Sequence, residues 1–203
     1  MARGVVPLVA CLAVAACQGP PRFRAEVVDP PRPVPDLVAR DHRGRVFRTA
    51  EQRGYVVVYF FGYTHCPDVC PGTLAKWKRA QEKLGEDARR IRWVFVTVDP
   101  ERDTARKVAE YLGLFSPDFL GLVGTEESLR PFYRAFGVLY EKVPQPGSAV
   151  GYLVGHTAFV PVVDVLGRWR LRFNFGTSVD DYVHDLRLLL GEAGQTRRGG
   201  VER

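Results

Sequence analysis

Two cysteines, Cys66 and Cys70, are the residues of this sequence best suited to chemistry. They follow the apolar run Tyr55–Phe61, which predicts a buried strand, and they precede a segment with helical spacing. The partial positive charge at a helix N-terminus favours thiolate and lowers the pKa of a thiol. In a regular helix, residues four apart have Cα atoms about 6 Å apart, within the range of a disulfide. We therefore expect redox or metal-binding thiols rather than two inert ones, with Pro67 and Pro71 keeping part of the pair in a loop.

A third ligand for a metal would have to come from one of the four histidines. Two thiolates and one imidazole suit Cu(I), whereas a structural zinc site normally closes with four protein ligands. We interpret His42, in a polar turn, and His184, in a terminal helix, as solvated or locally bonded. Metal binding by His65 beside Cys66 would strain the chelate. His156 follows a Gly- and Pro-rich stretch whose backbone can move, so it is the candidate ligand, with an ordinary structural histidine as the alternative.

Strands and helices alternate around these residues. Hydrophobic periodicity predicts strands over 55–61, 92–98 and from 119, and helices over 74–84, 103–114, 126–136 and 179–190. Hairpins are expected over 36–51 and 158–175, the second closed by Leu166 and Gly167. This order predicts an α/β fold in one domain, 36–191, whose central mixed sheet is flanked by helices and carries an extra β-hairpin.

The first 17 residues have the features of an export signal: a basic start at Arg3, an apolar run and small residues before Cys17. The apolar run is shorter than the about 20 residues that a membrane-spanning helix needs. Val14–Cys17 resembles the lipobox of bacterial lipoproteins, which implies lipidation at Cys17; Cys11 fits the pattern less well. We expect a domain on the extracytoplasmic face of the bacterial cell membrane, held by a lipid or, alternatively, by an unprocessed signal anchor.

Two further segments lie outside the expected domain. Residues 18–35 are rich in proline and predict a semi-rigid tether. Residues 192–203 are rich in Gly and Arg and are expected to be disordered. The formal charge is +6, with basic residues scattered rather than grouped with aromatic ones, which argues against a nucleic-acid partner. The domain itself contains one cysteine pair and therefore no disulfide framework.

Three segments, FFGYTHCPDVCPGTL, TVDPERDT and YLVGHT, together resemble the Sco/SenC family of copper-binding oxidase assembly proteins. The resemblance covers roughly residues 36 to 190. It implies a thioredoxin-like fold in which Cys66, Cys70 and His156 bind copper, as Cu(I) and in some states Cu(II). It also implies a role in maturing the CuA centre of cytochrome c oxidase, with the CuA-bearing subunit, a copper donor and a thiol reductant as partners.

Three positions deserve separate mention within this resemblance. Gly155 stands where the family usually has an aspartate before the histidine, so a carboxylate that could hold the imidazole is absent. Asp99 and Asp103 match a spaced acidic pair that could lie near the metal site. Because Asp99 precedes Pro100, helix capping is the preferred interpretation of this aspartate.

The functional hypothesis is a copper metallochaperone for the CuA centre. The alternative is a thiol-disulfide reductase that keeps the acceptor cysteines reduced, which would need Cys66 and Cys70 as a redox-active dithiol but not His156. A peroxiredoxin-like peroxidase is disfavoured because no threonine or serine precedes Cys66 in that family's pattern. A redox or copper sensor is disfavoured because the sequence shows no appended signalling domain.

Overall fold

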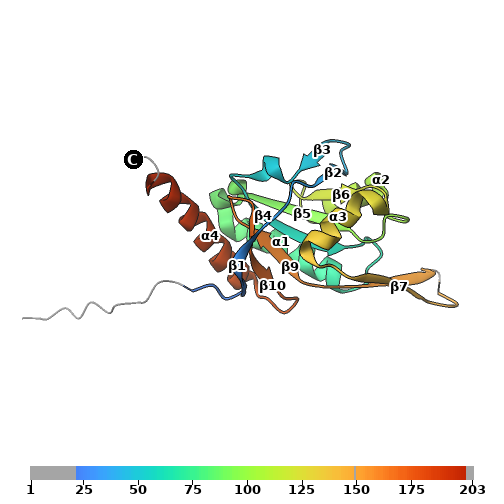
Figure 1. The fold of residues 1–203 in the computed structure, drawn as a ribbon. Coiled ribbons are helices and arrows are strands. Elements are labelled where there is room, and N and C mark those ends of the chain that lie inside the picture. Colours follow the sequence, from blue (N-terminus) through green and yellow to red (C-terminus); the bar gives the residue numbers. More distant parts are fainter. Residues whose placement is uncertain (1–21, 149, 200–203) are drawn as a thin grey trace, which may run out of the picture.

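An eight-stranded mixed sheet runs through the centre of the computed structural model, which describes residues 22–148 and 150–199 (Figure 1). Its strand order is β1-β10-β9-β4-β5-β6-β2-β3. Strands β4, β5 and β6 are parallel, while β9 pairs antiparallel with β4 and β2 antiparallel with β6. The strands of this sheet are β1 (Glu26–Pro33), β2 (Val38–Asp41), β3 (Val46–Arg48), β4 (Val56–Gly62), β5 (Ile91–Thr97), β6 (Leu120–Val123), β9 (Val160–Val163) and β10 (Arg168–Phe173). The predicted mixed α/β sheet and both predicted hairpins are confirmed.

Two further strands, β7 (Tyr140–Pro144) and β8 (Tyr152–His156), pair with each other in a separate antiparallel ribbon. In Figure 1 this ribbon extends away from the body of the molecule. The helices are α1 (Val69–Leu84), α2 (Ala105–Gly113), α3 (Glu126–Phe136) and α4 (Val179–Gly199), with short 3-10 turns η1 (Ala50–Gln52) and η2 (Gly85–Arg90). Within the described residues, no helix is both long and apolar enough to cross a membrane.

Strand β4 is buried on both faces, as its continuous apolar run predicts. The rings of Tyr59 and Phe61 contact Phe136 of α3, with centroids 4.9 and 5.7 Å apart. Phe60 points to the other face and contacts Trp77 of α1 with centroids 6.0 Å apart. Helices on both faces therefore hold β4 in place, and its C-terminal end leads directly to the cysteine pair.

The predicted tether is wrong for its described part. Residues 26–33 form β1, which pairs with β10 at the edge of the main sheet. Just before it, the backbone N–H groups of Arg24 and Ala25 donate to the carboxylate of Asp185 in α4, at 3.0 and 2.7 Å. Prolines do not prevent this pairing, because an edge strand can accommodate residues that lack an N–H. The folded domain thus begins well before residue 36.

The C-terminal boundary also differs from the prediction. Helix α4 continues from the expected end at Leu190 to Gly199, so residues 192–199 are helical rather than disordered. Glu, Ala, Gln and Arg are good helix formers, and in this segment they outweigh its glycines. Arg170 of β10 also pairs with Glu192, with Nη1 and Oε2 2.9 Å apart. The expected signal and Cys17 lie outside the described residues.

Candidate metal centre

The two thiols lie where the chain passes from the end of β4 to the start of α1. Cys66 belongs to the loop after β4, and Cys70 is the second residue of α1, so only part of the pair is helical, as expected. The backbone N–H of Cys70 donates to the sulfur of Cys66 at 3.4 Å. Helix α1 begins at Val69 rather than at Leu74, because Pro71 occupies the first turn, where N–H groups lack helical partners. The helix N-terminus therefore faces the Cys66 sulfur.

The environment separates the two thiols chemically. A hydrogen bond from the Cys70 thiol, helped by backbone N–H groups of Asp68 and Cys70, lowers the pKa of Cys66 to about 4 against the opposing effect of burial. The same bond to Cys66, together with burial, raises the pKa of Cys70. Cys66 is half-buried and Cys70 fully buried. Cys66 is thus the accessible thiolate, and Cys70 is the protonated thiol that stabilises it.

His156 is brought to this pair from the far end of the chain. Its Nε2 lies 3.9 Å from the Cys70 sulfur. Its Nδ1 lies 3.0 Å from the carbonyl oxygen of Thr157, to which it donates as the protonated nitrogen. This bond directs the Nε2 lone pair to the thiols, the arrangement that metal-binding histidines use. The ring of Tyr63 contacts the imidazole edge to face, with centroids 5.9 Å apart.

The spacing of these donors suits one small soft metal ion. Metal bonds of about 2.3 Å to sulfur and 2.0 Å to nitrogen, the lengths seen at zinc, would place the two donor atoms of a trigonal site about 3.7 Å apart. The observed separation of the Cys70 sulfur and the His156 Nε2 is 3.9 Å. Two sulfurs and one imidazole are the ligand types that favour Cu(I).

Gly62, the last residue of β4, is a site residue that the sequence analysis did not identify. A Cβ atom at this position would lie 2.9 Å from the Cys70 sulfur and 3.0 Å from ring atoms of Phe60 and Phe95. Glycine therefore lets the buried thiol lie directly against the backbone of β4. The position of this glycine four residues before Cys66 could have indicated from the sequence that it belongs to the site.

Position 155 is not placed to hold the imidazole of His156, as was expected for a carboxylate at this position. A side chain here would contact Glu141 on the neighbouring strand, with the added Cβ 3.5 Å from its Cγ. Successive residues of a strand face opposite sides, so a carboxylate at 155 would point away from the imidazole of His156. The carbonyl of Thr157 holds the imidazole instead.

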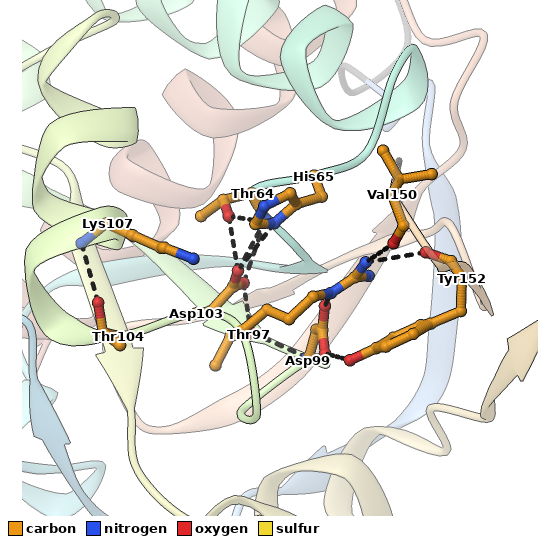
Figure 2. Close-up of polar contacts among 10 residues, drawn as sticks. Thr64, His65, Thr97, Asp99, Asp103, Thr104, Lys107, Val150 and Tyr152 are labelled. Carbon is orange, nitrogen blue, oxygen red and sulfur yellow. Dashed lines mark hydrogen bonds and ion pairs between the residues drawn. The ribbon is translucent and has the colours of Figure 1, made fainter. Parts of the chain in front are cut away.

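The predicted capping role of Asp99 is wrong. Helix α2 begins at Ala105, and its cap is Thr104, whose Oγ1 accepts from the N–H of Lys107 at 3.3 Å. Asp99 lies earlier, in a turn where its backbone carbonyl accepts from the N–H of Asp103 at 3.0 Å. Both aspartate side chains are buried, and Figure 2 shows Asp103 directed at Thr64 and Asp99 directed at Tyr152.

Asp103 supports the loop that carries Cys66. Its carboxylate accepts hydrogen bonds from the hydroxyls of Thr64 and Thr97, both at 2.6 Å, and from the N–H of Thr64. Burial raises the pKa of Asp103. Because Thr64 lies two residues before Cys66, these bonds fix the approach of the chain to the thiolate (Figure 2).

His65 faces Asp103, with its Nδ1 3.9 Å from a carboxylate oxygen and 3.1 Å from the Thr64 hydroxyl. Possible ligand atoms of His65, Asp99 and Asp103 all lie within 4.8 Å of one another. The carboxylates already have partners, however, because Arg102 and a tyrosine hydroxyl bond Asp99 and two threonines bond Asp103. We therefore interpret this group as structural support rather than as a second metal site.

Of the remaining histidines, His184 bonds a sequence neighbour, as predicted, whereas His42 accepts a hydrogen bond from a residue of β6 that is distant in the sequence. The Nδ1 of His42 accepts from the N–H of Gly121 at 2.9 Å, and burial lowers its pKa. The Nδ1 of His184 lies 2.8 Å from the carboxylate of Asp185.

Comparisons with known proteins agree with this geometry. The SCO1/SenC family model matches residues 32–191. The SCO2-like protein of Rickettsia conorii is 33% identical over 152 residues, which make up 75% of this chain and 74% of that protein.

Solved structures give the same result. Apo Sco1 of Thermus thermophilus is 40% identical, with a TM-score of 0.74 over 83% of this chain and 97% of that one. ScoI of Bradyrhizobium japonicum, solved with copper bound, is 32% identical, with a TM-score of 0.70 over 76% and 98%. The fold is thus the predicted thioredoxin-like fold of these structural neighbours. The chain belongs to the SCO1/SenC family.

Proposed function

We propose that this protein is a copper metallochaperone that binds one Cu(I) through Cys66, Cys70 and His156. The observation that carries the proposal is the convergence of a low-pKa thiolate, a buried thiol and an imidazole whose free Nε2 faces them. Soft sulfur ligands with one imidazole select Cu(I) over harder ions. Three ligands rather than four also suit a metal that must leave again.

Relatives of this family support copper as the cargo. ScoI of Bradyrhizobium japonicum and ScoI of Arabidopsis thaliana were both solved with copper bound. In the proposed reaction, Cu(I) passes to the CuA centre of a cytochrome c oxidase subunit, after arriving from a copper donor. The proposed site of action is the extracytoplasmic face of the membrane, with Cys17 as the lipid anchor.

The test is a Cu(I) titration of the reduced protein from residue 18 onward, against a competing chelator. We expect one copper per chain in the wild type. Cys66→Ser, Cys70→Ser and His156→Ala should each weaken binding by about tenfold or more, because each removes one donor. His184→Ala is the matched control, since its imidazole lies beside Asp185 in α4, and it should bind copper like the wild type. Equal affinity of the wild type and His156→Ala would refute the three-ligand site.

A second function, reduction of the acceptor's disulfide, is favoured by the unequal thiols. The Cys66 thiolate would attack one acceptor sulfur, forming a mixed disulfide and releasing the first acceptor thiolate. The Cys70 thiol would then lose its proton and attack the Cys66 sulfur, releasing the second acceptor thiolate. The acceptor gains two electrons, and this protein ends with a Cys66–Cys70 disulfide.

The two functions differ in their need for His156. Dithiol exchange requires only the cysteines, whereas copper binding requires the imidazole as well. We expect His156→Ala to keep most of its rate of reducing a model disulfide while losing copper affinity. If that variant loses both activities equally, the two functions cannot be separated by this residue.

A further inference from the structure

The ribbon of β7 and β8 carries His156, yet it is separate from the main sheet. A ribbon of two strands is only marginally stable alone in water. The position of His156 over the thiols must therefore depend on contacts between this ribbon and the body of the domain.

Arg102 makes several of these contacts, beside the ion pair of Lys142 with Glu101 and the ring contact of Tyr140 with Tyr133. Its Nη1 donates to the backbone carbonyls of Val150 and Tyr152, both at 2.9 Å, where the chain enters β8. Its Nε donates to the carboxylate of Asp99 at 2.5 Å. Asp99, Val150 and Tyr152 accordingly lie together in Figure 2, although they come from two separate segments. One guanidinium thus ties the turn after β5 to the start of β8.

Asp99 and Tyr152 close the same group. The hydroxyl of Tyr152 donates to Asp99 at 2.7 Å, and the guanidinium carbon of Arg102 lies 3.6 Å from the centre of the Tyr152 ring. The Asp99 side chain is fully buried, and that of Arg102 is 17% exposed. Charged hydrogen bonds in such a dry environment are stronger than those at the surface.

This group reaches the metal site through β8 and Tyr63. Tyr152 and His156 lie on the same face of β8, because they are four residues apart in a strand. The ring of Tyr63 contacts His156 and also lies 5.9 Å from the guanidinium carbon of Arg102. Movement of Arg102 would therefore disturb both the strand that carries the imidazole and the ring that supports it.

We infer that Arg102, held by Asp99 and Tyr152, is a positioning residue that sets His156 over the cysteine pair without touching the metal. This inference rests on the proposed Cu(I) site. An arginine is required because its rigid planar guanidinium places Nε at the Asp99 carboxylate and Nη1 at the two carbonyls, whereas the donors of a lysine all lie on one nitrogen.

The test combines Arg102→Lys with His156→Ala in a double-mutant cycle of Cu(I) affinity. We expect Arg102→Lys to weaken binding by about tenfold, the usual effect of losing support behind a metal ligand. The double variant should bind no more weakly than His156→Ala alone, because the lysine acts only through the imidazole. Tyr152→Phe, which removes one hydroxyl, should give a smaller loss.

The matched control is Arg106→Lys, which alters an exposed arginine paired with Glu110 and should leave affinity unchanged. Wild-type affinity in Arg102→Lys, or additive losses in the double variant, would overturn the inference while leaving the copper site intact. Equal binding by the wild type and His156→Ala would instead overturn the proposed site. Nitrogen-15 relaxation of residues 140–156 in the copper-free protein gives an independent result: Arg102→Lys should make this ribbon more mobile, and unchanged relaxation would also contradict the inference.

Discussion

At the residue scale, the two neighbouring thiols of the site differ in protonation: Cys66 is a thiolate and Cys70 is a protonated thiol. Cys66 accepts hydrogen bonds from the start of α1 and from Cys70, which stabilise its charge. Cys70 packs against Gly62 and remains protonated until a metal or a disulfide replaces its proton. His156 adds a neutral donor whose tautomer is fixed by a backbone carbonyl. A soft metal and a disulfide can therefore use the same residues.

The low pKa of Cys66 predicts unusual alkylation kinetics. An ordinary thiol with a pKa of about 8.5 reacts about tenfold faster for each pH unit between 5 and 8. With a pKa of about 4, Cys66 is already thiolate over this range, so its rate with iodoacetamide should be nearly constant from pH 5.5 to 8. The copper-free wild type and Cys70→Ala should be compared, since alanine removes the hydrogen bond from position 70, which should raise the pKa of Cys66 and make its alkylation rate depend on pH. If the alkylation rate of the wild type instead rose about tenfold for each pH unit, the low pKa of Cys66 would be contradicted.

Gly62→Ala should displace the Cys70 thiol, because the added Cβ would lie 2.9 Å from its sulfur. We expect Cu(I) affinity to fall and the free energy of unfolding to drop by about 1–3 kcal/mol, the usual cost of overpacking. Chelator competition and urea unfolding measure the two effects. Gly113→Ala is the control, since an added Cβ there meets no neighbouring atom within 4 Å. Unchanged copper affinity in Gly62→Ala would show that the sulfur can move aside freely.

At the element scale, the site lies where a strand, a helix and a separate ribbon meet. β4 ends shortly before Cys66, α1 begins next to Cys70, and β8 carries His156. The turn 99–103 contacts two of these parts, the loop of Cys66 through Asp103 and the ribbon through Arg102. β1 has a different task, because it covers the edge of the sheet formed by β10.

Removal of β1 should destabilise the domain. A chain that begins at residue 36 would lose the pairing with β10 and would leave the buried carboxylate of Asp185 without its partners at Arg24 and Ala25. We expect the free energy of unfolding to fall by about 2 kcal/mol or more relative to a chain that begins at residue 22, because an unsatisfied buried acceptor alone costs about 1–3 kcal/mol. Urea unfolding of both chains measures this. Equal urea midpoints for the two chains would mean that residues 22–35 do not stabilise the domain.

At the scale of the whole molecule, the ligands come from distant parts of one chain, so the site exists only when the domain is folded. Helices α2 and α3 and strands β5, β6 and β7 lie along the chain between Cys70 and His156. An unfolded chain would not hold the three donors together. Metal binding and folding should therefore be linked.

This linkage predicts stabilisation by Cu(I). With free Cu(I) buffered at 100 times its dissociation constant, the folded state should gain about 2.7 kcal/mol. For a domain of this size, the melting temperature should rise by about 5–10 °C. Calorimetry under reducing conditions measures the shift, and at the same free Cu(I) concentration Cys70→Ser should show about half of it or less. An equal rise in that variant would mean that copper binds elsewhere or that it also binds the unfolded chain.

Much of the architecture could be predicted because it depends on local patterns. The continuous apolar run of β4 and the helical spacing of α3 predicted these elements to within about one residue, since burial imposes periods of 2 and 3.6. The boundaries failed where a tertiary partner decided the outcome. β10 recruits the proline-rich segment 26–33 into the sheet, and Arg170 supports the extended end of α4.

The site likewise has features that local sequence patterns determine and features that only tertiary contacts decide. The sequence by itself determined that Cys66 and Cys70 lie at a strand-to-helix junction, and residue type, spacing and the helix terminus predict that this pair is reactive. Only the tertiary structure decided that His156 meets them and that Arg102 ties its ribbon to the body of the domain. No local rule relates positions 66, 102 and 156. Their distances depend on where the ring of His156 meets Phe60 of β4 and on where the buried carboxylate of Asp99 finds its partners.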